Sequence, residues 1–222
     1  MLSPPEWEAL RLSALVGIGA TACVLPPAAL LGHLFATRSF RGKALAETLL
    51  LLPLVLPPVV TGYGLLVLLG RRGPLGPCLD ALGVPVVFTW RGCVAASAVM
   101  AFPLAYRACR TAFEAVDPRL PAQARTLGAS RADAFLSVSV PLARGGLLAA
   151  AVLAFARSVG EFGATIVLAG NVEGETRTLP VAVFSEIQAR GHEGAWRLAA
   201  LCVVLAVGAL VASETLARRR PR

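Results

Sequence analysis

Two ionisable residues, Arg157 and Glu161, lie inside an apolar stretch that is long enough to cross a membrane, Leu142–Ala169. They are four residues apart, so on a helix they share one face and can form an ion pair. Ionisable side chains at such depth usually face the interior of a helical bundle and mark a transport pathway. Two interpretations stay open: the pair locks the position of the helix, or it takes part in the passage of an anion.

Small and polar residues surround this pair. Gly160 and Gly163 thin the helix, which allows a neighbouring helix or a substrate to approach the backbone. The candidate pathway residues of this stretch are Arg157, Ser158, Gly160, Glu161, Gly163 and Thr165. The polar segment that follows, 170–180, leads into an apolar piece too short to span, Val181–Ala189, which we expect to be a helix or half-helix near the outer mouth of the pathway.

A second unusual stretch, Leu50–Gly64, places three prolines and two glycines inside another apolar block. Proline leaves a backbone carbonyl without its helical partner, and lipid cannot satisfy that carbonyl. We therefore expect this helix to be broken where it faces protein or a water-filled path, and a simple kink with no pathway role is the alternative. Its candidate pathway residues are Pro57, Pro58, Thr61 and Gly62.

The third feature is a polar, helix-prone and basic insert between two apolar blocks, the Gly128 loop (about residues 114–141). A loop that only joins two spans needs a handful of turn residues, so its length and character predict that it docks a partner. Gly128 is expected at a turn between two short helices, where glycine tolerates backbone angles that other residues avoid. The candidate contact residues are Ala124, Arg125, Leu127, Gly128, Ala129 and Pro141.

The composition is that of a membrane protein, so membrane helices must position these residues. The 222 residues are 56% hydrophobic and 15% charged, and the mean hydropathy is +0.71. A span needs about 20 mostly apolar residues, and the blocks of that length are Leu10–Ala36, Ala44–Gly70, Arg91–Phe113, Leu142–Ala169 and Ala195–Ala217. The first block is longer than the apolar part of a signal peptide and lacks a strongly positive start, so we interpret it as a retained helix. The sequence predicts one all-α membrane domain, residues 1–222, with about five transmembrane helices.

Basic residues indicate the orientation, because they accumulate in cytoplasmic segments. Most of the 21 lysines and arginines fall in Thr37–Lys43, Tyr106–Arg144 and the C-terminal tail. This places the N-terminus outside and the Gly128 loop and C-terminus in the cytoplasm; the Arg71–Arg72 pair argues weakly against it. The net charge of +8 is therefore assigned to contacts with anionic membrane lipid and not with nucleic acid.

Several kinds of chemistry find no support in the sequence. The single lysine, Lys43, lies in no GxxxxGK[ST] motif, so any nucleotide-binding machinery must be another polypeptide. The five cysteines show no metal-ligand spacing, and two free thiols are a better interpretation of Cys78 and Cys93 than a disulfide. We expect no metal site, and no nucleophile–base set is present for an intramembrane enzyme.

The quoted motifs resemble one family. The Gly128 loop is similar to the coupling loop of binding-protein-dependent ABC importers, although Ala122-Gln123 stand where that pattern has Glu-Ala. The stretches FARSVGEFGATIVLAGNVEGETRTLP and LLLPLVLPPVVTGYGLLVLLG resemble the permease subunits of molybdate ABC importers, with the sulfate and tungstate permeases as close relatives. The resemblance covers about Leu10–Leu216.

This resemblance implies the type I ABC importer permease fold, in the cytoplasmic (inner) membrane, with the Gly128 loop as the coupling element. It implies a homodimer that carries the oxyanion between its two copies and docks two ATP-binding cassette subunits and an extracytoplasmic oxyanion-binding protein. It also implies a subunit that is not an enzyme and binds no cofactor, because ATP is used by the partner. An ion-coupled secondary transporter is the alternative, but such folds usually contain internal repeats, and none is evident.

Overall fold

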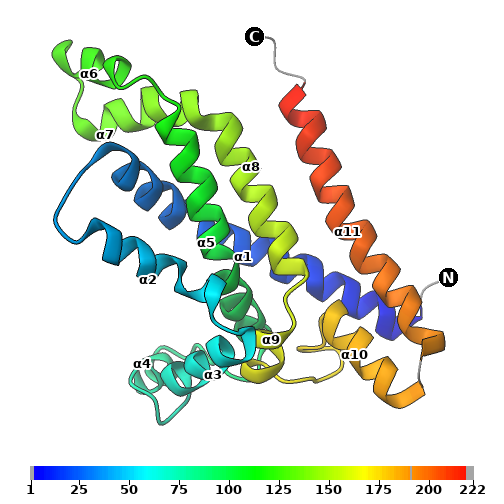
Figure 1. The fold of residues 1–222 in the computed structure, drawn as a ribbon. Helices are drawn as coiled ribbons and strands as arrows, with labels where there is room; N and C mark the ends of the chain where they lie inside the picture. Colours follow the sequence, from blue (N-terminus) through cyan, green and yellow to red (C-terminus); the bar gives the residue numbers. More distant parts are fainter. Residues whose placement is uncertain (1–2, 191, 219–222) are drawn as a thin grey trace.

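A computed structural model describes residues 3–190 and 192–218, and every regular element among them is helical (Figure 1). The elements in chain order are α1 (Pro4–Thr37), α2 (Lys43–Val55), α3 (Pro58–Leu69), α4 (Gly76–Ala81), α5 (Trp90–Glu114), α6 (Arg119–Thr126), α7 (Arg131–Ala134), the π-helical turn η1 (Phe135–Ser139), α8 (Val140–Val159), α9 (Gly163–Leu168), α10 (Leu179–Arg190) and α11 (His192–Arg218).

Four helical segments of the described chain are long and apolar enough to cross a membrane, and the bent pair α2–α3 makes up to five spans. The number of transmembrane helices expected from the sequence, about five, is confirmed. Three of the expected spans match single helices closely, namely α1, α5 and α11. Residues 219–222, which carry part of the basic C-terminal tail, lie outside the described residues.

The second span is broken, as its prolines predict. Helices α2 and α3 are bent by 110° at the short break between Val55 and Pro58. Pro58 takes the first position of α3, where its missing N–H costs nothing. In contrast, α1 continues without a break through Pro26 and Pro27, so proline alone does not decide where a membrane helix ends.

The fourth span differs from the expected Leu142–Ala169. The membrane-length segment runs from Arg131 to Val159, through α7, η1 and α8, and it ends there. Gly160 is the C-cap of α8, and α9 begins as a separate short helix at Gly163. The expected continuous helix is wrong because the two glycines flank a buried carboxylate, which bonds the backbone of α9 and ends the helical run.

The centre of the molecule is the packing of α1, α5 and α8 (Figure 1). Glycine allows close approach of backbones: a Cβ atom added at Gly32 of α1 would lie 2.9 Å from the backbone nitrogen of Arg110 in α5. At Gly17 an added Cβ atom would instead meet side chains of α8, at 2.8 Å from the Phe155 ring and 2.9 Å from a Val159 methyl group. The buried residues here are mostly small, as is common between membrane helices: Val24, Ala28, Phe35, Ala101, Ala105, Tyr106, Cys109, Ala150 and Ala154.

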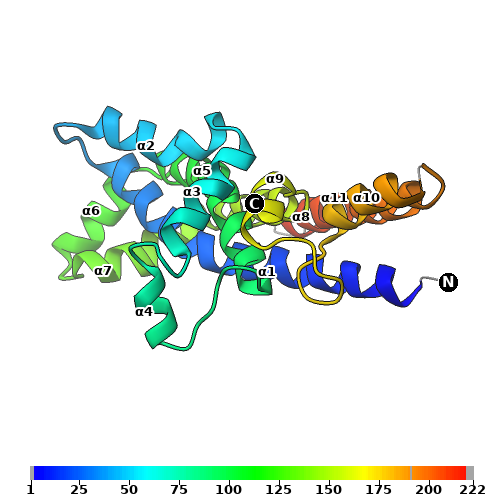
Figure 2. The same ribbon diagram turned by 90° about the horizontal axis from the view of Figure 1, so that it is seen from below.

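The two ends of this bundle differ. Helices α6 and α7 lie at one end together with the C-terminal end of α11, whereas α3, α4, α9 and α10 lie at the other (Figure 1). From below, α10 and α11 lie alongside each other beside the N-terminal half of α1 (Figure 2). A hydrogen bond of 2.7 Å from the Leu179 amide to Ser13 Oγ joins α10 to α1. The short helix expected after the polar outer segment is thus present as α10.

Candidate translocation pathway and coupling loop

The broken second and fourth spans contact each other through their glycines. A Cβ atom added at Gly62 in α3 would lie 2.8 Å from both the Cα and the carbonyl oxygen of Ala164 in α9. One added at Gly163 would lie 2.8 Å from Cβ of Pro58. Helices α3 and α9 therefore pack backbone to backbone, and the structure brings together two groups of candidate pathway residues that are distant in the sequence.

The ion pair between Arg157 and Glu161 is present, although not on one helix. Arg157 lies in the last turn of α8 and Glu161 lies just beyond its end. Arg157 Nη1 and Glu161 Oε2 are 2.7 Å apart, and the Glu161 side chain is only 1% exposed. The second carboxylate oxygen, Oε1, accepts a hydrogen bond of 2.8 Å from the Ala164 amide at the start of α9. Glu161 therefore joins the end of α8 to the start of α9, and sequence spacing did not reveal this second contact.

Three hydroxyl groups around the α8–α9 break have buried oxygens. Ser158, Thr165 and Thr61 have side-chain oxygens with no hydrogen-bond partner among the described residues. Buried polar groups are normally bonded, so each of these oxygens calls for an explanation. All three residues are among those expected from sequence to line the pathway, and together they give the α3–α9 junction a capacity for polar contacts.

A second ionic cluster was not expected from sequence. Arg110 in α5 forms ion pairs with Glu47 of α2 and, at 2.7 Å, with Glu114 one turn further along α5. No residue of α2 is fully buried, and the Glu47–Arg110 pair joins this helix to α5 beside the partly buried Ala46, Leu50 and Leu51, which pack against the core. Glu47 is 63 residues from Arg110, and a single sequence carries no local signal for such a pair.

The Gly128 loop has the geometry that its sequence predicts. Gly128 lies between α6 and α7 with φ of +99°, in the left-handed region that favours glycine. The loop closes with a bond of 3.0 Å from the Ala129 amide to the Ala124 carbonyl. Leu127 is 89% exposed, and Arg125 lies beside it in the last turn of α6. The tip of this turn therefore presents an exposed leucine beside an arginine, at the place where the sequence predicts a docking contact.

Pro141 marks the point where this loop joins the membrane helix. It lies in the first turn of α8, directly after η1. The bonding just before it is π-helical, since the Val140 amide donates to the Phe135 carbonyl five residues back. Such π turns occur as single insertions inside α-helices, often at functional sites. The Gly128 loop is therefore continuous with α8 through one helical run, Arg131–Val159.

The segment between α9 and α10 contains hydrogen bonds of its own, most of them between backbone groups. The Val172 carbonyl accepts bonds from the amides of Glu175, Thr176 and Arg177, and the buried Thr176 Oγ1 accepts a bond of 2.9 Å from the Val172 amide. Cys93 lies behind this segment with Sγ 3.5 Å from the Thr176 carbonyl oxygen. Cys78 and Cys93 are both free, as expected.

The chain is an all-helical membrane protein with two broken spans in contact and an exposed loop of two short helices at the other end, which fits the membrane component of a transport system. The family model for the binding-protein-dependent transport system inner membrane component matches residues 28–219. The chain belongs to this family.

Relatives of known name agree with this assignment. The chain is 50% identical to the molybdenum transport system permease protein ModB of Escherichia coli (strain K12), over 98% of this chain and 96% of that protein. It is 44% identical to ModB of Haemophilus influenzae, over 96% and 94% of the two chains.

Two solved transporter structures have the same fold. An amino acid ABC transporter crystallised with histidines matches with a TM-score of 0.66 and 21% identity over 98% of this chain and 94% of that chain. The MetNI methionine ABC transporter, in inward-facing conformations, matches with a TM-score of 0.69 and 16% identity over the full length of both chains.

Membership of this family explains why the sequence has no nucleotide-binding motif. The protein is a multi-pass permease component of the inner membrane that works with a binding protein, and the ATPase activity belongs to a separate subunit. The permease subunit itself is not an enzyme and binds no cofactor, which fits the absence of a nucleotide-binding motif from its sequence.

Proposed function

We propose that this chain is the permease subunit of an ATP-driven importer of molybdate. The observation that carries the proposal is the identity of 50% and 44% to named molybdenum transport permeases over nearly the whole chain. Tungstate and sulfate are the competing substrates, since all three are tetrahedral oxyanions. The affinity for the oxyanion resides in the binding protein, so the permease needs only a passage and no tight site.

The working unit is a homodimer with the passage between its two copies, bound to two ATP-binding cassette subunits. Support comes from α3, which buries only Gly62 among its residues. Tyr63 is 62% exposed and Val67 is 53% exposed, so one face of this broken span is free to meet a second copy. Each copy contributes its α3–α9 junction, with the candidate residues Pro57, Pro58, Thr61, Gly62, Arg157, Ser158, Gly160, Glu161, Gly163 and Thr165.

The orientation has the N-terminus outside and the Gly128 loop in the cytoplasm. ATP binding closes the two ATPase subunits, and their motion reaches the membrane as a rigid-body tilt of the helices that continue from the loop. The passage then opens toward the binding protein, and hydrolysis returns it to the inward-open state. The contact residues are Ala124, Arg125, Leu127, Gly128, Ala129 and Pro141.

The test of substrate and energy source is uptake by proteoliposomes that contain the permease, its ATPase and the binding protein. We expect uptake of radiolabelled molybdate only with ATP, and competition by tungstate more than by sulfate. Uptake driven by an ion gradient without ATP would overturn the proposal, and a preference for sulfate would change its substrate.

The test of coupling is Gly128→Asp. Nothing lies within 4 Å of a Cβ atom added at Gly128, and aspartate tolerates a left-handed backbone better than most residues. The fold should therefore survive, while a charge at the docking tip abolishes transport and weakens ATPase binding.

Gly83→Asp is the matched control. Gly83 also has a positive φ, +65°, and open space around its Cα, but it lies in the loop after α4, at the other end of the bundle. It should retain uptake. If Gly128→Asp retains wild-type uptake with the ATPase attached, this loop is not the coupling element.

A further inference from the structure

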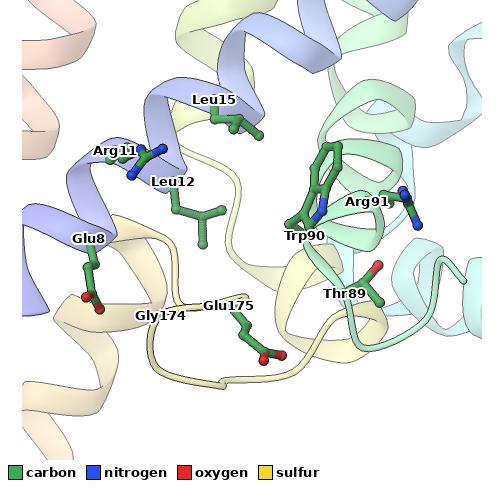
Figure 3. Close-up of a pocket in the computed structure, with 9 residues that line it drawn as sticks. All are labelled: Glu8, Arg11, Leu12, Leu15, Thr89, Trp90, Arg91, Gly174 and Glu175. Atoms are coloured by element: carbon green, nitrogen blue, oxygen red, sulfur yellow. The ribbon is translucent and has the colours of Figure 1, made fainter.

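A cavity of about 580 Å³ opens between the first turns of α1, the start of α5 and the segment before α10. Figure 3 shows Glu8, Arg11, Leu12 and Leu15 along α1 on one side, and Thr89, Trp90 and Arg91 on the other. The backbone at Gly174 and the side chain of Glu175 close it from below (Figure 3). The candidate pathway residues do not line this cavity.

The charges in the cavity are of both signs and are not used within the chain. Glu8, Arg11 and Glu175 form no ion pair and no side-chain hydrogen bond with any residue that the structure describes. The loop approaches α1 closely, since a Cβ atom added at Gly174 would lie 3.4 Å from Glu8 Oε2. Both carboxylates line the cavity, and Arg11 lies about 4.5 Å further along the helix axis than Glu8, at 1.5 Å per residue.

The face of α1 becomes apolar directly after Arg11. Leu15 is 43% exposed and Ile18 is 64% exposed, and both lie on the face of Arg11 because they follow it by four and seven residues. Across the cavity, Trp90 is 46% exposed, and the Arg91 guanidinium lies 5.4 Å from the centroid of its ring. Tryptophan is enriched where a membrane protein passes from the hydrocarbon to the headgroups.

The order of groups along α1 is therefore acid, base, hydrocarbon. A phospholipid with a primary amine presents the complementary order from water inward: ammonium, phosphate and acyl chain. We propose that this cavity binds the headgroup of phosphatidylethanolamine. The ammonium lies between Glu8 and Glu175, the phosphate meets Arg11, and an acyl chain runs along Leu15 and Ile18.

The same charges disfavour two other occupants. A dianionic oxyanion could pair with Arg11 but would also meet the carboxylates of Glu8 and Glu175, which disfavours the transported substrate as the occupant. A metal ion would need more ligands, and no group of three metal-binding side chains occurs in the described part of the chain. The lipid inference needs only that the N-terminal end of α1 lies at a membrane surface, so it does not depend on the proposed substrate.

The experiment is native mass spectrometry of the purified full-length protein in mixed micelles that contain phosphatidylethanolamine, phosphatidylcholine or phosphatidylglycerol. Phosphatidylcholine keeps the phosphate but has no N–H to donate to a carboxylate, and phosphatidylglycerol has no amine. We expect retention of phosphatidylethanolamine over phosphatidylcholine by about tenfold, the ratio that one hydrogen bond to a charged group supplies.

Variants distinguish the contacts. Glu8→Gln with Glu175→Gln should reduce that ratio to near one, whereas Arg11→Gln should weaken both lipids. Glu173→Gln is the matched control, because Glu173 lies in the same segment as Glu175 but outside the cavity, and it should keep the wild-type ratio.

Equal retention of all three lipids by the wild type, or an unchanged ratio in the double variant, would overturn the proposal. So would a double variant that loses only its affinity for the binding protein, because the cavity would then be a protein-docking site. If the wild-type protein retains the lipid ratio but shows no ATP-driven molybdate uptake, that result counts against the proposed transport function and not against the lipid site.

Discussion

The two members of the Arg157–Glu161 pair should not be equally costly to remove. The side chain of Arg157 is 26% exposed, whereas that of Glu161 is 1% exposed. Arg157→Ala leaves a buried carboxylate with the Ala164 amide as its remaining partner, and breaking a buried pair in this way costs about 3–5 kcal/mol. Glu161→Ala leaves a guanidinium that is already partly exposed at the surface of the chain and one unpaired backbone amide, which together cost about 1–3 kcal/mol.

The assay is the melting temperature and folded yield of the purified protein in detergent. We expect Arg157→Ala to lower both more than Glu161→Ala does, and the double variant to be milder than the sum of the two, since neither charge is then stranded. The control is the Arg177–Glu173 pair, which has the same spacing and a similar distance of 2.8 Å but exposures of 27% and 53%. Its removal should change stability by less than about 1 kcal/mol.

Conservative substitutions separate a structural role from a transport role. If Arg157 guides the oxyanion, Arg157→Gln folds normally and loses uptake, while Glu161→Gln keeps substantial uptake. We favour the structural role, because a bare fixed cation would hold a dianion too firmly to release it. Arg157→Ala with a wild-type melting temperature would refute the structural reasoning, and normal folding and uptake in both single variants would refute both roles.

Two further predictions concern helix packing and orientation. Gly62→Ala should destabilise the protein by about 1–3 kcal/mol, because the added methyl group meets the backbone of Ala164. Gly64→Ala in the same helix has open space around it and should melt like the wild type; equal melting of both variants would contradict the α3–α9 contact. In a chain without native cysteines, an impermeant maleimide applied to intact cells should label Glu173→Cys and not Gln123→Cys, and the reverse pattern would invert the proposed topology.

The sequence predicts the break in the second span but not that in the fourth, for a physical reason. Pro57 and Pro58 remove backbone donors, so the first break is encoded locally. The break in the fourth span depends on the buried carboxylate of Glu161. This carboxylate accepts a hydrogen bond from the Ala164 amide and thereby replaces a bond of the regular helix. A prediction from the length of the apolar stretch alone therefore extends the fourth span through the break. The signal that was available is the pair of glycines that flank Glu161, since glycine is a poor helix former.

Contacts between distant segments form the larger part of what sequence reasoning missed. The pairing of Glu47 with Arg110 and the packing of Gly62 on Ala164 join helices that are far apart in the chain. The types of these residues indicate that something approaches closely or pairs there, but they do not say which partner is chosen. The sequence therefore proposes a set of candidate site residues, whereas only the fold shows which of them lie together.

That assembly suggests how motion at one end of the molecule reaches the other. One helical run, Arg131–Val159, begins beside Gly128 and ends at the Arg157–Glu161 pair; at 1.5 Å per residue it is about 43 Å long. Glu161 fixes the end of this run to α9, and α9 packs on α3 with no side chains between their backbones at Gly62. Close-packed contacts of this kind shift as units and do not deform continuously. A tilt imposed at the Gly128 loop should therefore displace α9 and α3 together, and those two helices carry the break of each pathway span.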